Sequence, residues 1–504
     1  MPSDPTVPAS RRDVLRRLTL AGAGAALISP AQSAAHADSP DDVTVLRGVT
    51  LIDGTGAPPR RGVSLVVADG RIAWIGEDHH ATARRARRVV DLRGKFVIPG
   101  LWDMHTHGTQ DEKIVPPLLI ANGVLGIRET WGFPQLHQLR DRIERGELLG
   151  PRIVLAGNII DGPVSLLSPI HTKVETEAEA RQVVRAQQAE GADFLKIYPY
   201  LGREPFLALT DEARKAGIPV DGHIPYLVPM SEASRAGQRS FEHLYGLPLA
   251  TSGREQELRR RMEDTPIDPA APREWFNLAR SLERQAADSY DQAKARELYA
   301  QLARDGSWHS PTLTVLNVFS QPAETYADDP RLKYMPTHLR AYWAEGIKLF
   351  TPSTPEEITR ERRFFRQLLA LVGRLHRAGV GLVGGTDCYN PYVFPGFGAH
   401  DELSLLVRAG LSPMAALQTM TRDAARFLGR EDTLGTLAPG KAADLVVLDA
   451  DPLADIRNTR RIHAVMTRGR LIGPQERERI LADVQAAAQA PAAQAVVPAC
   501  ACHR

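Results

Sequence analysis

Hydrophobic and polar positions change their period twice along this chain. Between residues 43 and 97, short apolar runs alternate with turn-forming clusters, and Asp69-Gly70 separates two of these runs. An Asp-Gly pair between alternating apolar segments favours a β-hairpin. The same short-strand pattern returns at 432–474. We therefore predict a small β-sandwich built from segments 43–97 and 432–474, which are far apart in the sequence.

Residues 98–431 instead alternate apolar strand patterns with helical patterns. The predicted strands are 96–103, 124–128, 152–157, 193–198, 218–222, 239–243, 310–316 and 380–386. The predicted helices between and after them are 111–122, 134–146, 175–190, 204–216, 356–378, 401–409 and 412–427. Eight alternating units of this kind predict an α/β protein with a (β/α)8 TIM-like barrel. The stretch 250–308 is longer than one crossover needs, so we predict a helical insertion, with one charged helix at 282–304.

The first 37 residues have the features of an export signal. Arg11 and Arg12 precede an apolar stretch at 18–28, and Ala35-His36-Ala37 follows as a small-residue cleavage site. Paired arginines in this position are typical of a twin-arginine signal, and the apolar stretch is too short to span a membrane. We predict a protein exported to the periplasm or the medium without a stable membrane anchor. The alternative is a disordered basic tail.

Overall composition narrows the possible partners but does not identify one. A formal net charge of +2 gives no reason to expect a nucleic acid or an acidic membrane surface as partner. Three cysteines are too few for a disulfide scaffold in 504 residues. The tail 475–504 is rich in Ala and Pro, and its Cys500-Ala501-Cys502-His503 offers too few ligands for a convincing metal site.

Metal-ligand residue types recur where the predicted barrel strands end. Barrel enzymes place their active sites at the carboxyl ends of these strands, so such residues should meet at one mouth. Imidazole and carboxylate groups are also the ligands that zinc and similar cations take. The candidate ligands are His105, His107, Lys196, His223, His243 and Asp387.

A lysine inside an apolar strand is the least expected member of this set. Burying an ammonium group costs several kcal/mol unless the charge is paired or removed. Lys196 would therefore either form a salt bridge with a nearby acid or carry a carbamate, which would convert it into an anionic oxygen ligand.

This ligand set resembles that of the binuclear amidohydrolase superfamily. The similarity includes the approach Ile98-Pro99-Gly100-Leu101, the block Gly191-Ala192-Asp193-Phe194-Leu195-Lys196, and the return Gly440-Lys441-Ala442-Ala443-Asp444-Leu445. Within the superfamily, the chain is most similar to the imidazolonepropionase-like and Xaa-Pro dipeptidase-like branch.

The resemblance implies a role for each ligand. His105, His107 and Asp387 would hold the more buried of two divalent metal ions, and His223 and His243 would hold the other. Lys196, as an N6-carboxylysine formed with CO2, would bridge the pair. Zinc suits these ligands best, although other divalent metals also fit.

The resemblance also implies a reaction. A hydroxide shared by the two metals would attack a carbonyl group, and Asp387 would carry a proton to the leaving nitrogen. The expected substrate is a small-molecule amide or dipeptide-like compound with an amide, peptide-like or cyclic C–N bond. The alternatives are a mononuclear deaminase or imidazolone-type hydrolase, which generally lacks the bridging lysine, and a lactone or ester hydrolase. A non-enzymatic binding protein would be expected to lack some of the six ligand residues, and none is missing here. A homo-oligomer is compatible with every alternative.

Of five further polar residues, three have two interpretations each. Tyr226 could donate its hydroxyl to an oxyanion or pack on the barrel rim, and His171 could contact substrate or sit in an exposed loop. We interpret Arg128 as structural, paired with Glu129 or Asp103. His400 could reach the barrel mouth or lie at the start of a helix. Cys388 follows Asp387 without a triad around it, so we do not expect it to act as a nucleophile.

Overall fold

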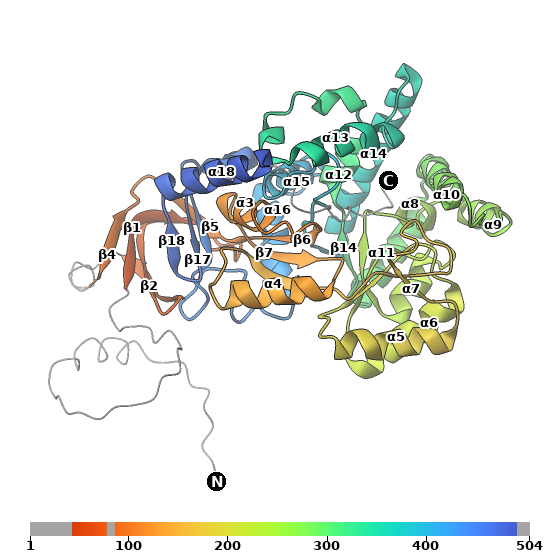
Figure 1. Cartoon of the computed structure of the whole chain (residues 1–504), viewed down its shortest axis with the longest axis horizontal. Coiled ribbons are helices and arrows are strands. Elements are labelled where there is room, and N and C mark those ends of the chain that lie inside the picture. Colours follow the sequence, from red (N-terminus) through yellow and green to blue (C-terminus); the bar gives the residue numbers. More distant parts are fainter. Residues whose placement is uncertain (1–42, 78–85, 491–504) are drawn as a thin grey trace, which may run out of the picture.

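One mixed sheet and two parallel sheets organise the computed structural model, which describes residues 43–77 and 86–490 (Figure 1). The predicted leader and the cysteines near the C-terminus lie outside these residues, so export stays a prediction. None of the helices in the described ranges combines the length and apolarity needed to cross a bilayer.

The mixed sheet joins the two ends of the described chain. Its strands are β1 (Thr44–Leu51), β2 (Arg60–Ala68), β3 (Arg71–Glu77), β4 (Arg88–Asp91), β5 (Phe96–Pro99), β16 (Leu445–Leu448), β17 (Ile462–Thr467) and β18 (Arg470–Ile472). The order is β18-β17-β16-β5-β1-β2-β3, with β4 beside β1. Antiparallel pairing of β5 with β16, from Pro99–Leu445 to Phe96–Leu448, joins the two predicted segments. Their pairing is as expected, whereas a two-layer sandwich stays a prediction.

The parallel strands follow one another in the order expected for a barrel. One sheet contains β6 (Leu101–Thr106), β7 (Val124–Glu129) and β8 (Arg152–Leu155). The other contains β10 (Thr172–Lys173), β9 (Ile160–Asp161), β11 (Leu195–Ile197), β12 (Val220–Gly222), β13 (Gln238–Glu242), β14 (Trp308–Ser310) and β15 (Gly381–Leu382). Single parallel bridges, Ala156–Phe194 and Thr106–Cys388, link the two sheets at both ends. These links support the (β/α)8 prediction.

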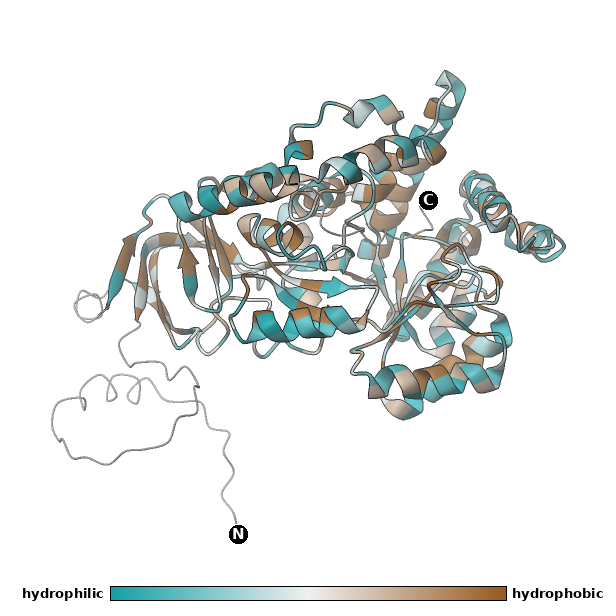
Figure 2. Ribbon diagram, in the orientation of Figure 1, coloured by the Kyte–Doolittle hydropathy of each residue, from teal (hydrophilic) through white to brown (hydrophobic). Residues whose placement is uncertain are grey.

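Helices cover these strands; most of those that the sequence predicted begin within three residues of the predicted positions, and the helix at 230–236 was not predicted. They are α3 (Val115–Ala121), α4 (Pro134–Glu144), α5 (Glu177–Ala189), α6 (Arg203–Ala216), α7 (Met230–Ala236), α14 (Pro355–Arg377) and α15 (Phe397–Arg408). Their apolar stripes alternate with hydrophilic ones in Figure 2, as amphipathic helices on a core require. The helix α18 (Pro474–Gln489) returns the C-terminal end to α3 (Figure 1).

Several predicted elements are split in the structure. The predicted strand 96–103 divides at Gly100 into β5 and β6, which belong to different sheets. The predicted helix 282–304 divides into α10 (Pro272–Ala287) and α11 (Gln292–Arg304), because the Asp291 carboxylate accepts hydrogen bonds from Ala293 N and Lys294 N and starts a new helix.

The other elements complete the chain. The predicted helix 412–427 divides into α16 (Pro413–Thr419) and α17 (Arg422–Phe427), and the insertion begins with α8 (Leu247–Ala250) and α9 (Glu255–Glu263). A helical segment that the sequence analysis did not predict contains η1 (Ala323–Tyr326), η2 (Pro330–Tyr334), α13 (Thr337–Gly346) and η3 (Ile347–Leu349), and η4 (Ile456–Arg460) precedes β17.

The predicted strand 310–316 is wrong in most of its length. The strand β14 ends at Ser310, and α12 (Leu313–Phe319) follows at once. The Glu402 carboxylate, from the distant helix α15, accepts hydrogen bonds from Leu313 N at 3.0 Å and Thr314 N at 2.7 Å. Because the group that caps α12 is 89 residues away, the local pattern could not reveal this helix.

Candidate active site

The six predicted ligand side chains come from five strands and meet at one end of the parallel strands. His105 lies in β6 and Lys196 in β11, while His107, His223, His243 and Asp387 immediately follow or lie just beyond their strands. His107 is 2 % exposed, and the other five are fully buried. Six polar side chains in a dry site need partners, so their mutual geometry decides their role.

Asp387 is the centre of this cluster. Its Oδ1 lies 3.2 Å from His107 Nε2 and 3.4 Å from His105 Nε2, and its Oδ2 lies 3.6 Å from His243 Nδ1. Lys196 Nζ lies 3.5 Å from His105 Nε2. The ring centroids of His223 and His243 are 4.6 Å apart, which attaches the sixth residue to the group.

These separations fit donors that share a cation. Two ligand atoms, each about 2 Å from a tetrahedral zinc ion, lie roughly 3.3 Å apart. The measured distances from Asp387 to His105 and His107 are close to that value. His105, His243 and Asp387 offer one ligand atom each within 4.8 Å of one another. Burial lowers the pKa of His105 to about 4, with the Lys196 charge acting in the same direction, so its imidazole is neutral, as a ligand must be.

The surroundings of Lys196 distinguish between the two interpretations that the sequence left open, a salt-bridged ammonium group and a carbamate. Within residues 43–77 and 86–490, no carboxylate lies within 4.0 Å of its Nζ atom, although the side chain is fully buried. Its charge reaches Glu242 only at longer range. The salt bridge expected of a purely structural lysine is therefore absent from the described part of the chain, which favours a modified, anionic Lys196.

Buried acidic and basic groups behind the cluster orient His105. Glu242 Oε2 lies 2.6 Å from His105 Nδ1, which directs the other ring nitrogen toward Asp387. Arg128 donates to Glu242 Oε1 at 2.7 Å and to Asp221 Oδ2 at 3.0 Å. Although burial opposes it, the guanidinium of Arg128 holds the pKa of Glu242 well below its usual range.

The sequence analysis missed this network. Arg128 is structural as expected, but its predicted partners, Glu129 and Asp103, were wrong. The sequence feature that could have revealed this network was Glu242, a carboxylate at the carboxyl end of a predicted strand and next to the candidate ligand His243.

Replacement of Arg128 by Met should destabilise the fold by about 3–5 kcal/mol, because it leaves the buried Glu242 carboxylate without its cation. Urea unfolding followed by circular dichroism measures this loss. Arg457→Met is the control, since Arg457 forms an exposed pair with Asp455, and its effect should stay within about 0.5 kcal/mol. Equal midpoints for both variants would contradict a structural role for Arg128.

Asp103 ties β6 to the segment that follows β15. Its carboxylate accepts hydrogen bonds from Thr386 N at 2.9 Å, Thr386 Oγ1 at 2.6 Å and His105 N at 3.3 Å. Asp387 N donates to the His105 carbonyl at 2.8 Å. These bonds fix the spacing of His105 and Asp387.

The backbone is strained at the same place. His243, Leu244, Thr312 and Asp387 all have left-handed φ angles, of 59°, 59°, 45° and 62°. Such angles are uncommon outside glycine and cost about 1–3 kcal/mol each. His243 Nδ1 lies 2.8 Å from Thr312 Oγ1, so two of these strained residues hold each other. The fold therefore gives up some stability to hold these side chains in their positions.

The helical insertion reaches the site through α10. Arg280 lies over the Tyr245 ring, with its guanidinium carbon 4.1 Å from the centroid, and forms an ion pair with the buried Glu283. Glu283 also accepts a hydrogen bond from Gly246 N. The Tyr245 ring lies 5.1 Å from that of His243, so α10 supports the loop that carries this ligand.

Tyr226 packs against aromatic residues of the insertion and of the loop that follows His243. Its ring is buried and lies 6.3 Å from Tyr245 and 6.0 Å from both Trp275 and Phe276. Burial, with the nearby Glu283 charge, raises the pKa of its hydroxyl well above 10, which keeps that hydroxyl a donor. Packing against the insertion is thus observed, whereas a role toward an oxyanion stays a prediction.

The other secondary candidates, His171, His400 and Cys388, are described by their own surroundings, and a role of His171 toward substrate stays a prediction. His171 is half-buried, and its Nε2 lies 3.1 Å from the Gly162 carbonyl oxygen within its own loop. His400 is buried between Thr459 Oγ1 and the Asn122 carbonyl, both at 3.0 Å, so its side chain joins α15 to η4 and to the end of α3. Burial raises the pKa of the Cys388 thiol, which agrees with the expectation that it is not a nucleophile.

Comparison with known proteins assigns the class that this fold and cluster define. Residues 354–472 match the model of the amidohydrolase family. Imidazolonepropionase of Aromatoleum aromaticum is 27% identical over 413 residues, covering 79% of this chain and 87% of the relative. The resemblance to the amidohydrolase superfamily is thus confirmed through the amidohydrolase family domain at 354–472, and the chain is a hydrolase similar to enzymes that act on carbon–nitrogen bonds.

Solved structures agree with this assignment. A bottromycin amidohydrolase superposes with a TM-score of 0.70 at 27% identity, covering 88% of this chain and 90% of the other. A Xaa-Pro dipeptidase with methionine bound in its active site gives a TM-score of 0.61 at 21% identity, covering 86% and 100%. The second likeness concerns the fold alone.

Proposed function

We propose that this protein is a metal-dependent amidohydrolase that binds two divalent cations, preferably zinc, and hydrolyses an amide or peptide-like bond of a small molecule. The supporting observation is the meeting of His105, His107, His243 and Asp387 beside a buried Lys196 that has no carboxylate within 4.0 Å in the described chain. In this proposal Lys196 carries a carboxyl group derived from CO2, and His223 completes the second metal site.

The residues divide the chemistry between them. Cations held by these residues would supply Lewis acidity to the substrate carbonyl and to the attacking water. Asp387, within 3.6 Å of three imidazoles, would accept a proton from the attacking water and return it to the leaving nitrogen. Glu242 holds His105 in one tautomer, and the burial of all six groups excludes bulk solvent.

A mononuclear deaminase or imidazolone-type hydrolase is the second candidate. It is favoured by the kinship with imidazolonepropionase, but it gives Lys196 no function. Hydrolysis of a lactone or ester remains compatible with the same residues, since the attack on a C–O bond needs no other group. The names of the relatives, which include a dipeptidase, favour a small amide or dipeptide as substrate here.

Metal analysis of the purified full-length protein, prepared with and without bicarbonate, tests this proposal. We expect two equivalents of divalent metal and turnover of N-acyl amino acids or Xaa-Pro and other dipeptides. One equivalent, with ammonia released from a ring amine, would assign the chain to the deaminase class. Turnover of lactones alone would identify an ester-type hydrolase, and absence of tightly bound metal would remove the proposal.

Two further parts of the proposal depend on the sequence. Export through the twin-arginine route follows from Arg11-Arg12 and the leader at 1–37, and fractionation of cells expressing Arg11→Lys/Arg12→Lys checks it, since the variant should stay inside. The mixed sheet would form the proposed β-sandwich beside the closed barrel.

A further inference from the structure

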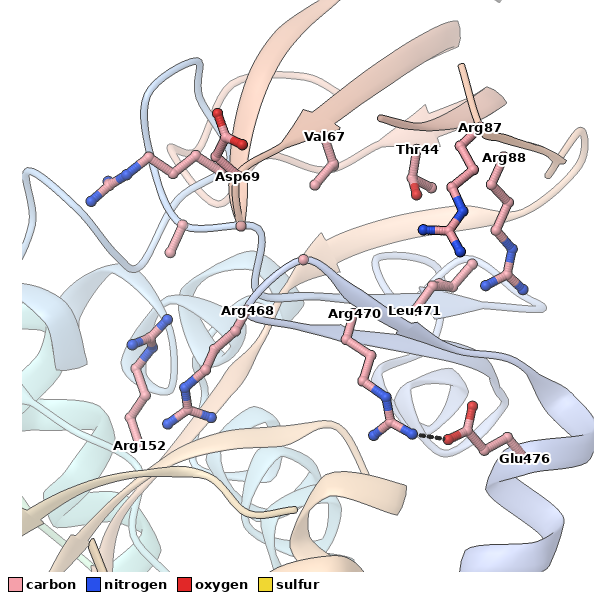
Figure 3. Close-up of a pocket in the computed structure, with 14 residues that line it drawn as sticks. Thr44, Val67, Asp69, Arg87, Arg88, Arg152, Arg468, Arg470, Leu471 and Glu476 are labelled. Atoms are coloured by element: carbon pink, nitrogen blue, oxygen red, sulfur yellow. Dashed lines mark hydrogen bonds and ion pairs between the residues drawn. The ribbon is translucent and has the colours of Figure 1, made fainter. Parts of the chain in front are cut away.

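A second site candidate lies in the mixed sheet, where a cavity of about 910 Å³ opens between β strands and the start of the barrel (Figure 3). Two carboxylates line it, Asp69 and Glu476. Its arginines outnumber them threefold: Arg71, Arg87, Arg88, Arg152, Arg468 and Arg470. Such an excess of one charge in a concave surface attracts an oppositely charged ligand.

Separate parts of the chain build this cavity. Arg71 begins β3, Arg88 begins β4, and Arg152 begins β8, while Arg468 lies in the turn between β17 and β18. The turns Asp69-Gly70 and Arg468-Gly469 touch, since a Cβ on Gly469 would lie 2.8 Å from Gly70 Cα. Contact between the two turns fixes the base of the cavity, so the arginines are in position before a ligand binds.

Internal ion pairs neutralise only part of this charge. Arg152 Nε lies 2.8 Å from Asp444, Arg468 Nη2 lies 3.0 Å from Glu144, and Arg470 pairs with Glu476. Arg71 donates to the Gly440 carbonyl at 3.0 Å. For Arg71 and Arg88, no carboxylate of the described chain lies within 4.0 Å. Arg88 and Arg87 point the same way in Figure 3, toward Leu471.

This cavity lies away from the metal-ligand cluster. Arg152 is the first residue of its barrel strand, whereas the cluster occupies the carboxyl ends of the strands. A ligand here would be neither substrate nor product of the proposed hydrolysis. Occupancy should therefore act on stability, or on the position of the mixed sheet against the barrel.

We propose that this cavity binds a small phosphorylated molecule. Arginine is suited to phosphate because its planar fork donates two parallel hydrogen bonds to two oxygens. The volume lies within the ~300–1,000 Å³ typical of small-molecule pockets, and it exceeds the needs of a single phosphate ion. Val67 and Leu471 offer apolar contact for the organic part. The same chemistry is offered by a phospholipid headgroup.

Calorimetric titration of the full-length protein with pyrophosphate and glycerol 3-phosphate at constant ionic strength tests the proposal. We expect saturable binding that Arg71→Gln/Arg88→Gln weakens at least tenfold. Arg214→Gln, on the exposed face of α6, should leave it unchanged. Chloride titrations at the same ionic strength should show no saturable binding, because screening of the arginine charges by salt requires no specific site.

A second arm separates the two sources of phosphate. Flotation with vesicles of phosphatidylglycerol, compared with phosphatidylcholine, reports recognition of a headgroup. Binding to phosphatidylglycerol alone, lost in the double variant, would assign the cavity to lipid; binding of the soluble compounds alone would assign it to a metabolite. Binding of neither, or equal binding by the double variant, would overturn the proposal. Unfolding midpoints in chloride show whether the variants are folded, and Arg88→Gln alone serves if the double variant is not.

Discussion

Asp387→Asn should lower kcat by about 10³–10⁴-fold while the fold and much of the bound metal are retained. Asparagine has the same shape and keeps an oxygen that can face His105 and His107, but it cannot accept a proton from water. The substitution should leave the backbone of the site unchanged, since the backbone N–H of residue 387 still donates to the His105 carbonyl. Steady-state kinetics on the best substrate, with metal content from mass spectrometry, measure both effects.

The control for this variant is Asp211→Asn, which changes a carboxylate in the surface ion-pair cluster of α6. Its kcat should match that of the parent protein. If Asp387→Asn keeps a near-normal kcat, Asp387 is not the proton carrier. If it loses all metal as well as activity, the residue is a ligand whose proton transfer is not separable from binding.

Lys196→Ala should remove at least one equivalent of metal and lower turnover by about 10³-fold. Loss of a bridging ligand forfeits several kcal/mol of transition-state stabilisation, which corresponds to this factor. The variant should also be less stable in urea than the parent, because it loses the stabilisation from the bound metal and the packing of a fully buried side chain. Metal analysis, kinetics and an unfolding curve on the same preparation provide the three readouts.

A spectroscopic test separates a carbamate from a plain lysine. Protein equilibrated with ¹³C-bicarbonate should give a carbamate resonance that disappears in Lys196→Ala and persists in Lys215→Ala, an exposed lysine of α6. Two equivalents of metal and normal kcat in Lys196→Ala would remove the bridging role. An absent resonance in the parent, with full activity, would leave a binuclear site without the modification.

Insertion helix α10 shows how elements far from the ligands support them. Glu283 holds the backbone after His243 through Gly246 N, and Arg280 covers Tyr245, whose ring touches the same histidine. The strained φ angles of His243 and Leu244 persist because this packing over-determines the loop. The position of the candidate ligand His243 therefore depends on packing against the insertion.

The sequence by itself determined the alternation of strands and helices and the residue types at the strand ends. Both are local properties: an apolar period identifies a strand or helix, and His105-Thr106-His107 or Thr386-Asp387 ends one whatever packs around it. Boundaries failed where a distant group decides them, as Glu402 does for the start of α12. The break at Gly100 likewise depends on which sheet each half joins.

Only the tertiary structure decided which charges meet. Arg128 could have paired with its neighbours Glu129 or Asp103, but packing of the barrel brought Glu242 from 114 residues away. The arginine cavity is assembled from strand starts and turns that no sequence window contains. Long-range pairing is set by the closure of sheets, and chain order alone does not encode it, since a buried charge takes whichever partner the fold delivers.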